Sequence, residues 1–196
     1  MPRIALLGYA LFAALAFGWR SWLQWRRTGS TGFRGLSGER GSLGRLLFVV
    51  AILVSPLAAA FDLGGLLPRI AVLDTRIVRL AGCVTFALGL AGTLWSQVAM
   101  GDSWRIGVDA SERTTLITNG PYRRVRNPIF TFMVLAVLGL ALLTPNALAL
   151  AAVAAVIAAV EIQVRTIEEP YLERVHGEPY RAYRERSGRF VPGVGR

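Results

Sequence analysis

Two short stretches of the chain combine residue types that could hold a small charged ligand. The first is NGPYRRVRNPIF at residues 119–130, where three arginines precede an Asn-Pro pair and a long apolar run. A helix that starts there aims free backbone N–H groups and the positive end of its dipole at whatever lies before it, which suits a carboxylate. An ordinary helix start, with Asn127 as N-cap and Pro128 as first residue, explains the same pair.

The second stretch ends the last apolar run and contains Glu161, Arg165, Glu168 and Glu169. On a regular α-helix these four residues lie within about a third of the circumference, so we expect one charged stripe. Glu161 and Arg165 are spaced for an ordinary intrahelical ion pair, which we favour for them. Burying either of the two adjacent glutamates at a membrane boundary is unfavourable unless a cation pairs with it. A positively charged ligand would meet that need.

A long polar loop, DSWRIGVDASERTTLIT at residues 102–118, lies between these stretches and the first half of the chain. Loops of this length are often functional, although an ordinary solvated loop is the alternative. The loop, the helix start and the carboxylates could face each other on one surface. Such a surface would suit a zwitterionic, partly cationic, nucleotide-like ligand such as S-adenosylmethionine.

The composition places these residues in a membrane protein. Of the 196 residues, 54% are hydrophobic and 17% are charged, and the mean hydropathy is +0.48, which departs from soluble domains in both respects. Five apolar segments are expected to be helices: residues 4–17, 46–61, 77–100, 129–143 and 147–160. The last two are joined by Thr144-Pro145-Asn146 and form a short helical hairpin whose arms reach about 22 Å, less than the ~30 Å hydrocarbon core.

The first segment is followed by three tryptophans interleaved with arginines, which is typical of an interfacial aromatic belt. A signal peptide is the alternative, but the apolar segments downstream favour a retained helix. We therefore expect an all-α integral membrane protein of one domain, residues 1–196, with about five transmembrane helices and a cytoplasmic helical C-terminal tail. Residues 1–100 form three helices, and residues 101–196 form the cofactor-binding loop, the hairpin and the tail.

The positions of the arginines predict the orientation. The net charge is +10 and the basic residues are all arginine. They gather in the loops after the first and third segments and in the tail, whereas the opposite side carries only Arg3, Arg69, Arg76 and Arg79. By the positive-inside rule the N-terminus lies outside and the candidate site lies on the cytoplasmic face. This distribution explains the charge without nucleic acid, and we expect a bacterial or archaeal inner membrane as the location.

Metal chemistry is a poor hypothesis for this chain. The single cysteine, Cys83, lies in an apolar segment, and the single histidine, His176, lies in the polar tail and is expected to be exposed. An intramolecular disulfide is impossible, and we expect no metal site. No obligatory protein partner is inferred.

The order LITNGPYRRVRNPIF, then a hairpin, then EEPYLERVHGEPYRAYRERSGRFVP resembles the isoprenylcysteine carboxyl methyltransferase family, and more widely the membrane methyltransferases that act on phospholipids. The resemblance covers residues 102–192, about half of the chain. It implies a methyl transfer from S-adenosylmethionine to a lipophilic acceptor, either a small molecule or a lipid, that reaches the site from the bilayer. The acceptor group would be a carboxylate, a thiol or an amine.

The resemblance also implies which residues contact the cofactor. They are Thr114, Thr115, Leu116, Ile117, Gly120, Tyr122, Arg126, Asn127, Pro128, Ile129, Phe130, Glu168 and Glu169. The family has an arginine just before its glutamates that faces the lipophilic substrate, and Arg165 is the nearest candidate. We expect Arg165 and Glu168 to be the catalytic residues, with Glu168 facing the sulfonium.

Two positions depart from the family pattern. Asn127 stands where the family has histidine, and Phe130 where it has tyrosine. Asn127 can donate a hydrogen bond to a cofactor carboxylate but cannot act as a base near neutral pH. Methyl transfer depends on in-line placement more than on proton transfer, so activity does not require the histidine. Two alternatives remain: an NADPH-dependent membrane reductase of the steroid-reductase type, and a non-enzymatic scaffold or transporter.

Overall fold

The computed structural model describes residues 1–32, 42–105 and 115–196, and the regular elements in these ranges are helices. The first long helix consists of α1 (Pro2–Phe12), the π-helical segment η1 (Ala13–Trp19) and α2 (Arg20–Thr28). It ends at Gly29, whose φ of 72° lies in the left-handed region that favours glycine. The next helices are α3 (Ser42–Leu63), α4 (Arg76–Met100), α5 (Pro128–Leu143) and α6 (Ala147–Gln163).

The polar end of the chain is helical too. A second π-helical segment, η4 (Val164–Glu168), joins α6 to α7 (Glu169–His176), and α8 (Glu178–Arg186) follows. Gly177 separates the last two helices with a φ of 56°, which lies in the left-handed region that favours glycine. Two short 3₁₀ turns complete the described elements: η2 (Gly101–Ser103) and η3 (Gly120–Arg123).

The helices have the lengths of an integral membrane protein. Among the described residues, four helices are long and apolar enough to cross a bilayer: Pro2–Thr28, Leu46–Leu63, Arg76–Ser103 and Ala147–His176. The first arm of the hairpin, α5, has 16 residues and spans about 24 Å, so it is short as predicted. The second arm is longer than predicted. The helix continues past Val160 through η4 and α7 because its Glu, Gln and Arg residues are good helix formers.

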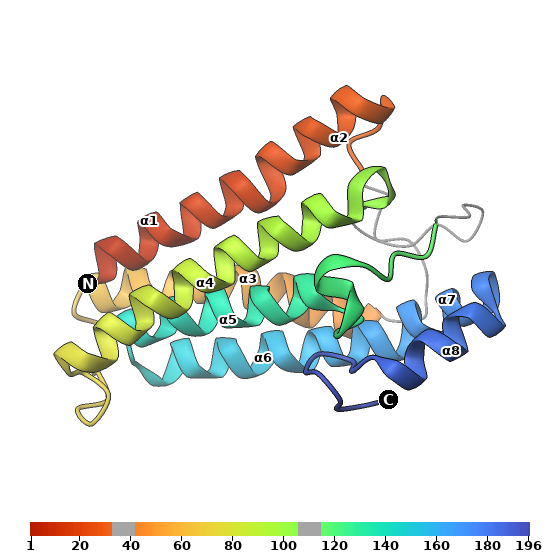
Figure 1. The fold of residues 1–196 in the computed structure, drawn as a ribbon. Helices are drawn as coiled ribbons and strands as arrows, with labels where there is room; N and C mark the ends of the chain where they lie inside the picture. The colour runs from red at the N-terminus through yellow and green to blue at the C-terminus, as the bar shows by residue number, and fades with distance from the viewer. Residues whose placement is uncertain (33–41, 106–114) are drawn as a thin grey trace.

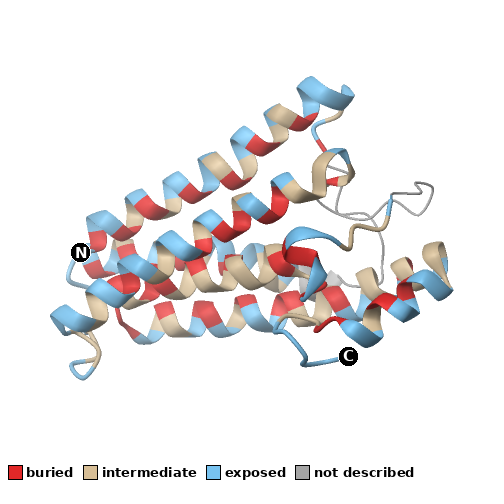
Figure 2. Cartoon of the chain, viewed as in Figure 1, coloured by how far each residue is buried: buried red, intermediate tan, exposed pale blue. Residues whose placement is uncertain are grey.

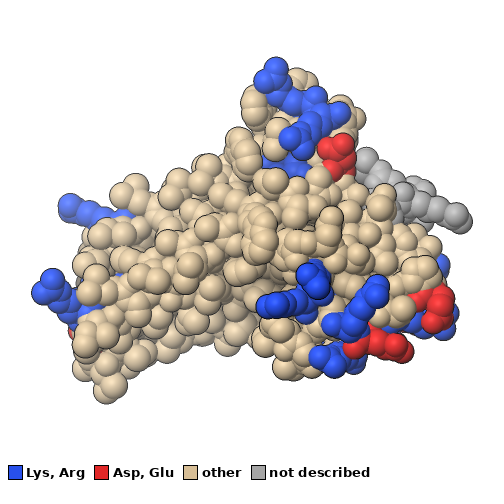
Figure 3. Space-filling model, viewed as in Figure 1, with Lys and Arg blue, Asp and Glu red and all other residues tan. Residues whose placement is uncertain are grey.

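The helices run side by side, and the loops gather at two ends (Figure 1). The N-terminus and the α3–α4 connection lie at one end. The end of α2, the turn η3, the helices α7 and α8 and the C-terminus lie at the other, which we call the arginine-rich end. Figure 3 shows arginines at both ends of the visible face and an uncharged band between them, as expected for a protein that spans a membrane.

Small residues bring α4 and α5 into close contact. A Cβ atom added at Gly89 of α4 would lie 2.3 Å from the backbone N of Ala136 in α5, and one at Gly139 of α5 would lie 2.3 Å from the backbone N of Phe86 in α4. Such close backbone approach is a common way for helices to associate in lipid, where the hydrophobic effect offers little between them. The contact fixes α5, and therefore its N-terminal end, against α4.

Large apolar side chains cover the outside of the bundle. Figure 2 shows exposed residues along the outer faces of the helices and buried residues between them. Leu53, Leu80, Val84, Leu88 and Ile157 are among the exposed ones. Exposure of this extent is expected where lipid rather than water surrounds the helices.

Ion pairs stabilise the end of the molecule opposite the arginine-rich one. Arg69 donates two hydrogen bonds of 2.8 and 2.9 Å to the buried carboxylate of Asp62. Asp74 also lies 3.4 Å from Arg69 and accepts a hydrogen bond of 3.0 Å from Arg79. The hydrogen bond with Asp62 raises the pKa of the Arg69 guanidinium. Arg69 and Arg79 thus help to hold the α3–α4 connection.

Candidate active site

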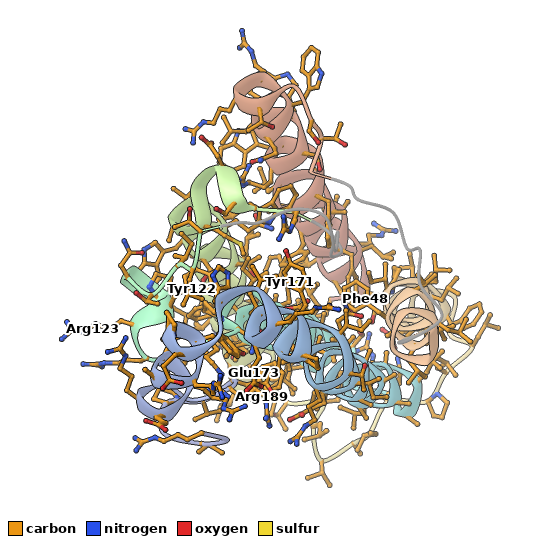
Figure 4. All side chains as sticks on the ribbon, turned by 90° about the vertical axis from the view of Figure 1, so that its right-hand side faces the viewer. Phe48, Tyr122, Arg123, Tyr171, Glu173 and Arg189 are labelled. Carbon is orange, nitrogen blue, oxygen red and sulfur yellow. The ribbon has the colours of Figure 1, made fainter. Side chains whose placement is uncertain are left out.

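The predicted site residues gather at the arginine-rich end, on η3, the start of α5 and the η4–α7 junction. Figure 4 views this end directly and shows Tyr122 and Tyr171 on its inner side, with Phe48 of α3 across from them, whereas Arg123 projects outward. Arg123 and Arg124 are exposed, so they suit the anchoring positions that a positively charged membrane boundary requires.

The turn η3 holds Tyr122 against two other elements. The turn starts at Gly120, whose φ of 55° favours glycine. The buried hydroxyl of Tyr122 donates a hydrogen bond of 3.3 Å to the Ser96 carbonyl in α4, and the Tyr122 carbonyl accepts one of 2.6 Å from Tyr183 in α8. Tyr122 is therefore fixed between α4 and the tail. The preceding residues, 115–117, have no regular secondary structure and are exposed or partly buried, and Thr114 lies outside the described residues.

The start of α5 is covered by the C-terminal tail. Asn127 occupies the N-cap position, but its side chain makes no capping hydrogen bond. Its Nδ2 donates instead to the Arg189 carbonyl at 3.2 Å, and its backbone N donates to the same oxygen at 3.1 Å. Thr131 donates to the Phe190 carbonyl at 2.8 Å. Pro128 is buried as the first helical residue.

The next two residues of α5, Ile129 and Phe130, are partly buried and pack on the apolar core of the bundle. They therefore anchor the start of α5 to the core. The N-terminal end that they support is the feature expected to attract an anionic group.

Arg126 is a buried residue that the tail surrounds. Its Nη1 donates to the carbonyls of Arg184 and Ser187, and its Nη2 donates to the Gly195 carbonyl at 2.6 Å and to the Glu169 carboxylate at 3.1 Å. Its side chain is only 2% exposed. Arg126 therefore holds the tail to the bundle through four acceptors.

Glu169 completes this clamp. Arg189 donates two hydrogen bonds of 2.8 and 2.9 Å to its carboxylate, in addition to the one from Arg126. The hydrogen bonds with Glu169 raise the pKa of the Arg189 guanidinium. Paired, partly desolvated interactions of this kind are among the strongest polar contacts in proteins. We call Arg126, Glu169 and Arg189 the tail clamp.

The π-helical segment η4 breaks the charged stripe that a regular helix would form. Arg165 pairs with Glu161 on the outer side of the helix, which confirms the predicted ion pair, and the Arg165 side chain is 56% exposed. Glu169 belongs to the tail clamp. A π-helical segment rotates by a smaller angle per residue than an α-helix does, so the side chains that follow it point in other directions than a regular helix predicts. Such segments are frequent at functional sites.

Glu168 has surroundings unlike those of Glu169. Gln163 interacts with its carboxyl group, and Arg105 is near enough to attract it. Within the described residues no arginine lies within ion-pair distance of Glu168. Burial is the main cause that raises the pKa of the Tyr122 hydroxyl, and Tyr183 and Glu168 raise it further. Glu168 thus lies near Tyr122 and outside the tail clamp.

Several polar residues beside Tyr122 escaped the sequence analysis. Arg20 is 1% exposed and Gln97 is 2% exposed, and both lie where the first long helix contacts α4. Trp104 stacks on Arg20 with 4.5 Å between the guanidinium carbon and the ring centroid. The polar pair Ser96-Gln97 inside an apolar segment was the signal that could have indicated them.

The sequence model of the phospholipid methyltransferases matches residues 77–179, which is more than half of the 196-residue chain. The chain belongs to this family. The matched range contains the predicted cofactor residues, including Tyr122, Asn127 and Glu168, but neither Arg20 nor Arg189. Methyltransferases of this kind generally take their methyl group from S-adenosylmethionine.

A solved structure has the same fold. The eukaryotic intramembrane Ras methyltransferase, an isoprenylcysteine carboxyl methyltransferase, aligns with a TM-score of 0.67 and 18% sequence identity over 100% of this chain and 69% of its own. No curated protein sequence matches the chain. The family and the fold confirm the predicted integral membrane methyltransferase that acts on a lipophilic substrate. They favour it over the reductase and scaffold alternatives.

Proposed function

We propose that this phospholipid methyltransferase family member binds S-adenosylmethionine at the arginine-rich end and methylates a carboxylate, thiol or amine of a lipophilic acceptor. The arginine distribution supports a cytoplasmic position for this end and an outside position for the N-terminus. The acceptor would enter from the bilayer beside the helices.

The observation that carries the proposal is the contrast between the two adjacent glutamates. Two arginines neutralise Glu169, whereas Glu168 lies beside Tyr122 without an arginine at ion-pair distance among the described residues. A partly buried carboxylate of this kind is stabilised by a cationic ligand. Glu168 therefore suits the sulfonium of S-adenosylmethionine, whose methyl group is the electrophile that the cofactor supplies.

The other site residues would position the ligand. Thr114 to Ile117 and Gly120 would form one wall with Tyr122, and the start of α5 from Asn127 to Phe130 would form another. Asn127 would donate a hydrogen bond rather than accept a proton. Arg126 and Glu169 would hold the tail against that wall, because both Nη atoms of Arg126 and the Glu169 carboxylate are bonded to tail residues or to each other.

Arg165 would orient the acceptor. Its side chain is more than half exposed on the outer face of the helix, where it pairs with Glu161. An exposed ion pair is worth about 1 kcal/mol or less, so an acceptor carboxylate or phosphate could replace Glu161 at little cost. Correct placement of the acceptor against the methyl group would supply most of the rate, since the reaction needs no obligatory base when the acceptor is already ionised.

Binding measurements test the proposal. Purified protein in detergent is titrated with labelled S-adenosylmethionine and, separately, with NADPH. We expect saturable binding of S-adenosylmethionine and none of NADPH. Glu168→Gln should bind S-adenosylmethionine at least about tenfold more weakly, because one charge interaction is lost. Glu173→Gln is the matched control, because Glu173 in α7 pairs with Arg181 and Arg184 of α8, and all three side chains are more than a third exposed. Binding of NADPH alone would contradict the proposal.

A further inference from the structure

Arg20 is a buried cation in the first long helix, outside the range matched by the family. Its Nη1 donates to Gln24 at 2.9 Å and its Nη2 donates to the Gly101 carbonyl at 2.6 Å. Among the described residues no carboxylate forms an ion pair with it, and its buried Nε has no hydrogen-bond partner. Asp102 attracts this cation without forming an ion pair with it. A buried charge without a direct ion pair is unusual, and so is an unsatisfied buried donor.

Gln97 is a second buried side chain with an unused polar atom. Its Nε2 donates to the Ala16 carbonyl at 2.9 Å, whereas its buried Oε1 accepts no hydrogen bond in the part of the chain that the structure describes. Gln97 lies near the C-terminal end of the apolar helix α4 and is buried against the first long helix, where an unpaired polar atom is costly. Its amide oxygen is therefore a buried acceptor that a hydrogen-bond donor of a ligand could satisfy.

The two unused atoms belong to the same helix contact. Ala16 and Arg20 are one turn apart in the first long helix, and Gln97 in α4 lies one turn before Gly101, the first residue of η2. The bond from Gln97 to Ala16 and the bond from Arg20 to Gly101 cross between these helices. Arg20 and Gln97 therefore stand in adjacent layers of one interface, about one helical turn from each other.

This interface adjoins the candidate active site. The Tyr122 hydroxyl donates to the carbonyl of Ser96, the residue before Gln97. The electrostatic effects on the pKa of Tyr122 include a rise caused by Glu168 and a decrease caused by Arg20. Tyr122 therefore lies near both a cation and a carboxylate, on elements that are far apart in sequence.

We propose that Arg20 and Gln97 form a subsite for the zwitterionic end of a ligand. The Nε–H of Arg20 would donate to a carboxylate or phosphate oxygen, and Oε1 of Gln97 would accept a hydrogen bond from an ammonium group. The inference rests on the proposed function, within which two ligands carry this chemistry. They are S-adenosylmethionine, through its amino-acid end, and a lipid acceptor with an amine and a phosphate in its head group.

Two cofactor products separate a ligand contact from a structural effect. S-adenosylhomocysteine carries the amino-acid end, and 5′-methylthioadenosine is an otherwise similar neutral thioether that lacks it. Binding of each is measured by calorimetry for the wild type, Arg20→Lys, Gln97→Met and the control Thr93→Val. Arg20→Lys keeps the charge for folding, and Thr93 is buried in α4 with its hydroxyl bonded within that helix.

We expect Arg20→Lys and Gln97→Met each to weaken the binding of S-adenosylhomocysteine by about tenfold or more. The affinity for methylthioadenosine should change by less than about twofold. If the lipid is the ligand, the variants leave the binding affinity for both thioethers unchanged. In that case the KM for an amine-bearing phospholipid in nanodiscs rises about tenfold in Arg20→Lys and Gln97→Met and stays unchanged in Thr93→Val.

The inference is overturned if the variants weaken the binding of both thioethers equally, or if they change neither the binding of any ligand nor the KM. Arg20 and Gln97 would then only share a buried water. A wild-type protein that binds neither thioether, nor S-adenosylmethionine, contradicts the proposed function itself.

Discussion

The tail clamp predicts that one partly buried carboxylate, that of Glu169, keeps the C-terminal tail folded over the start of α5. Glu169→Gln removes the charge that accepts hydrogen bonds from Arg126 and Arg189. The Arg126 side chain is 2% exposed, so its charge would remain buried without a counter-charge. Breaking a buried pair costs roughly 3–5 kcal/mol, and the partial exposure of Glu169 places the change near the lower value.

Limited trypsin digestion measures this change directly. Trypsin cleaves after arginine, and the bonds after Arg186 and Arg189 are protected while the tail is folded. When opening is fast relative to cleavage, the cleavage rate follows the open population. A loss of about 3 kcal/mol therefore raises cleavage in the tail about a hundredfold, identified by the mass of the released peptide.

Glu173→Gln is the control for this experiment. Glu173 also pairs with a tail arginine, Arg184, at 3.4 Å, but both side chains are more than a third exposed. Such pairs contribute about 0–1 kcal/mol, so cleavage should rise by no more than about fivefold. Equal cleavage rates in Glu169→Gln and Glu173→Gln, with both proteins folded, would refute the clamp.

Two further variants test the packing of the bundle and of the tail. Gly89→Ala places a Cβ 2.3 Å from a backbone atom of α5, and we expect loss of monodisperse protein in size-exclusion chromatography, whereas Gly18→Ala, with only a 3.9 Å contact, is tolerated. Burial raises the pKa of Tyr183 to about 12, above the ~10 of an exposed tyrosine. Its contribution to stability is therefore complete below pH 10 and is lost as the pH rises toward 12. Above pH 10 the unfolding temperature should fall less steeply with pH in Tyr183→Phe than in the wild type. Identical slopes in the two proteins would contradict this assignment.

Local patterns in the sequence predicted the spanning helices, the short α5 arm, the helix start at Pro128 and the Glu161–Arg165 pair. Each of these features depends on residues a few positions apart, on apolar length or on helix geometry. The family resemblance added the chemistry, and the match over residues 77–179 supports it.

Long-range contacts were beyond the sequence patterns. The tail returns to α5 through a bridge between Val125 and Gly188 and through the carbonyls that Arg126 binds. The π-helical segment η4 turns Glu168 and Glu169 toward different partners, which a regular 100° per residue does not predict. Arg20 was assigned to an interfacial belt because its tryptophan neighbours dominate that stretch, although it is buried against α4.

Transfer of a labelled methyl group tests the central claim most directly. The protein is reconstituted in bilayers with a total lipid extract and given S-adenosylmethionine labelled in its methyl group, and the label is then counted in the organic phase. The account predicts label in lipid for the wild type and for Glu173→Gln, and about a tenth of that label or less in folded Glu168→Gln. Label that stays in the aqueous phase with every lipid, or equal transfer by Glu168→Gln, would contradict it.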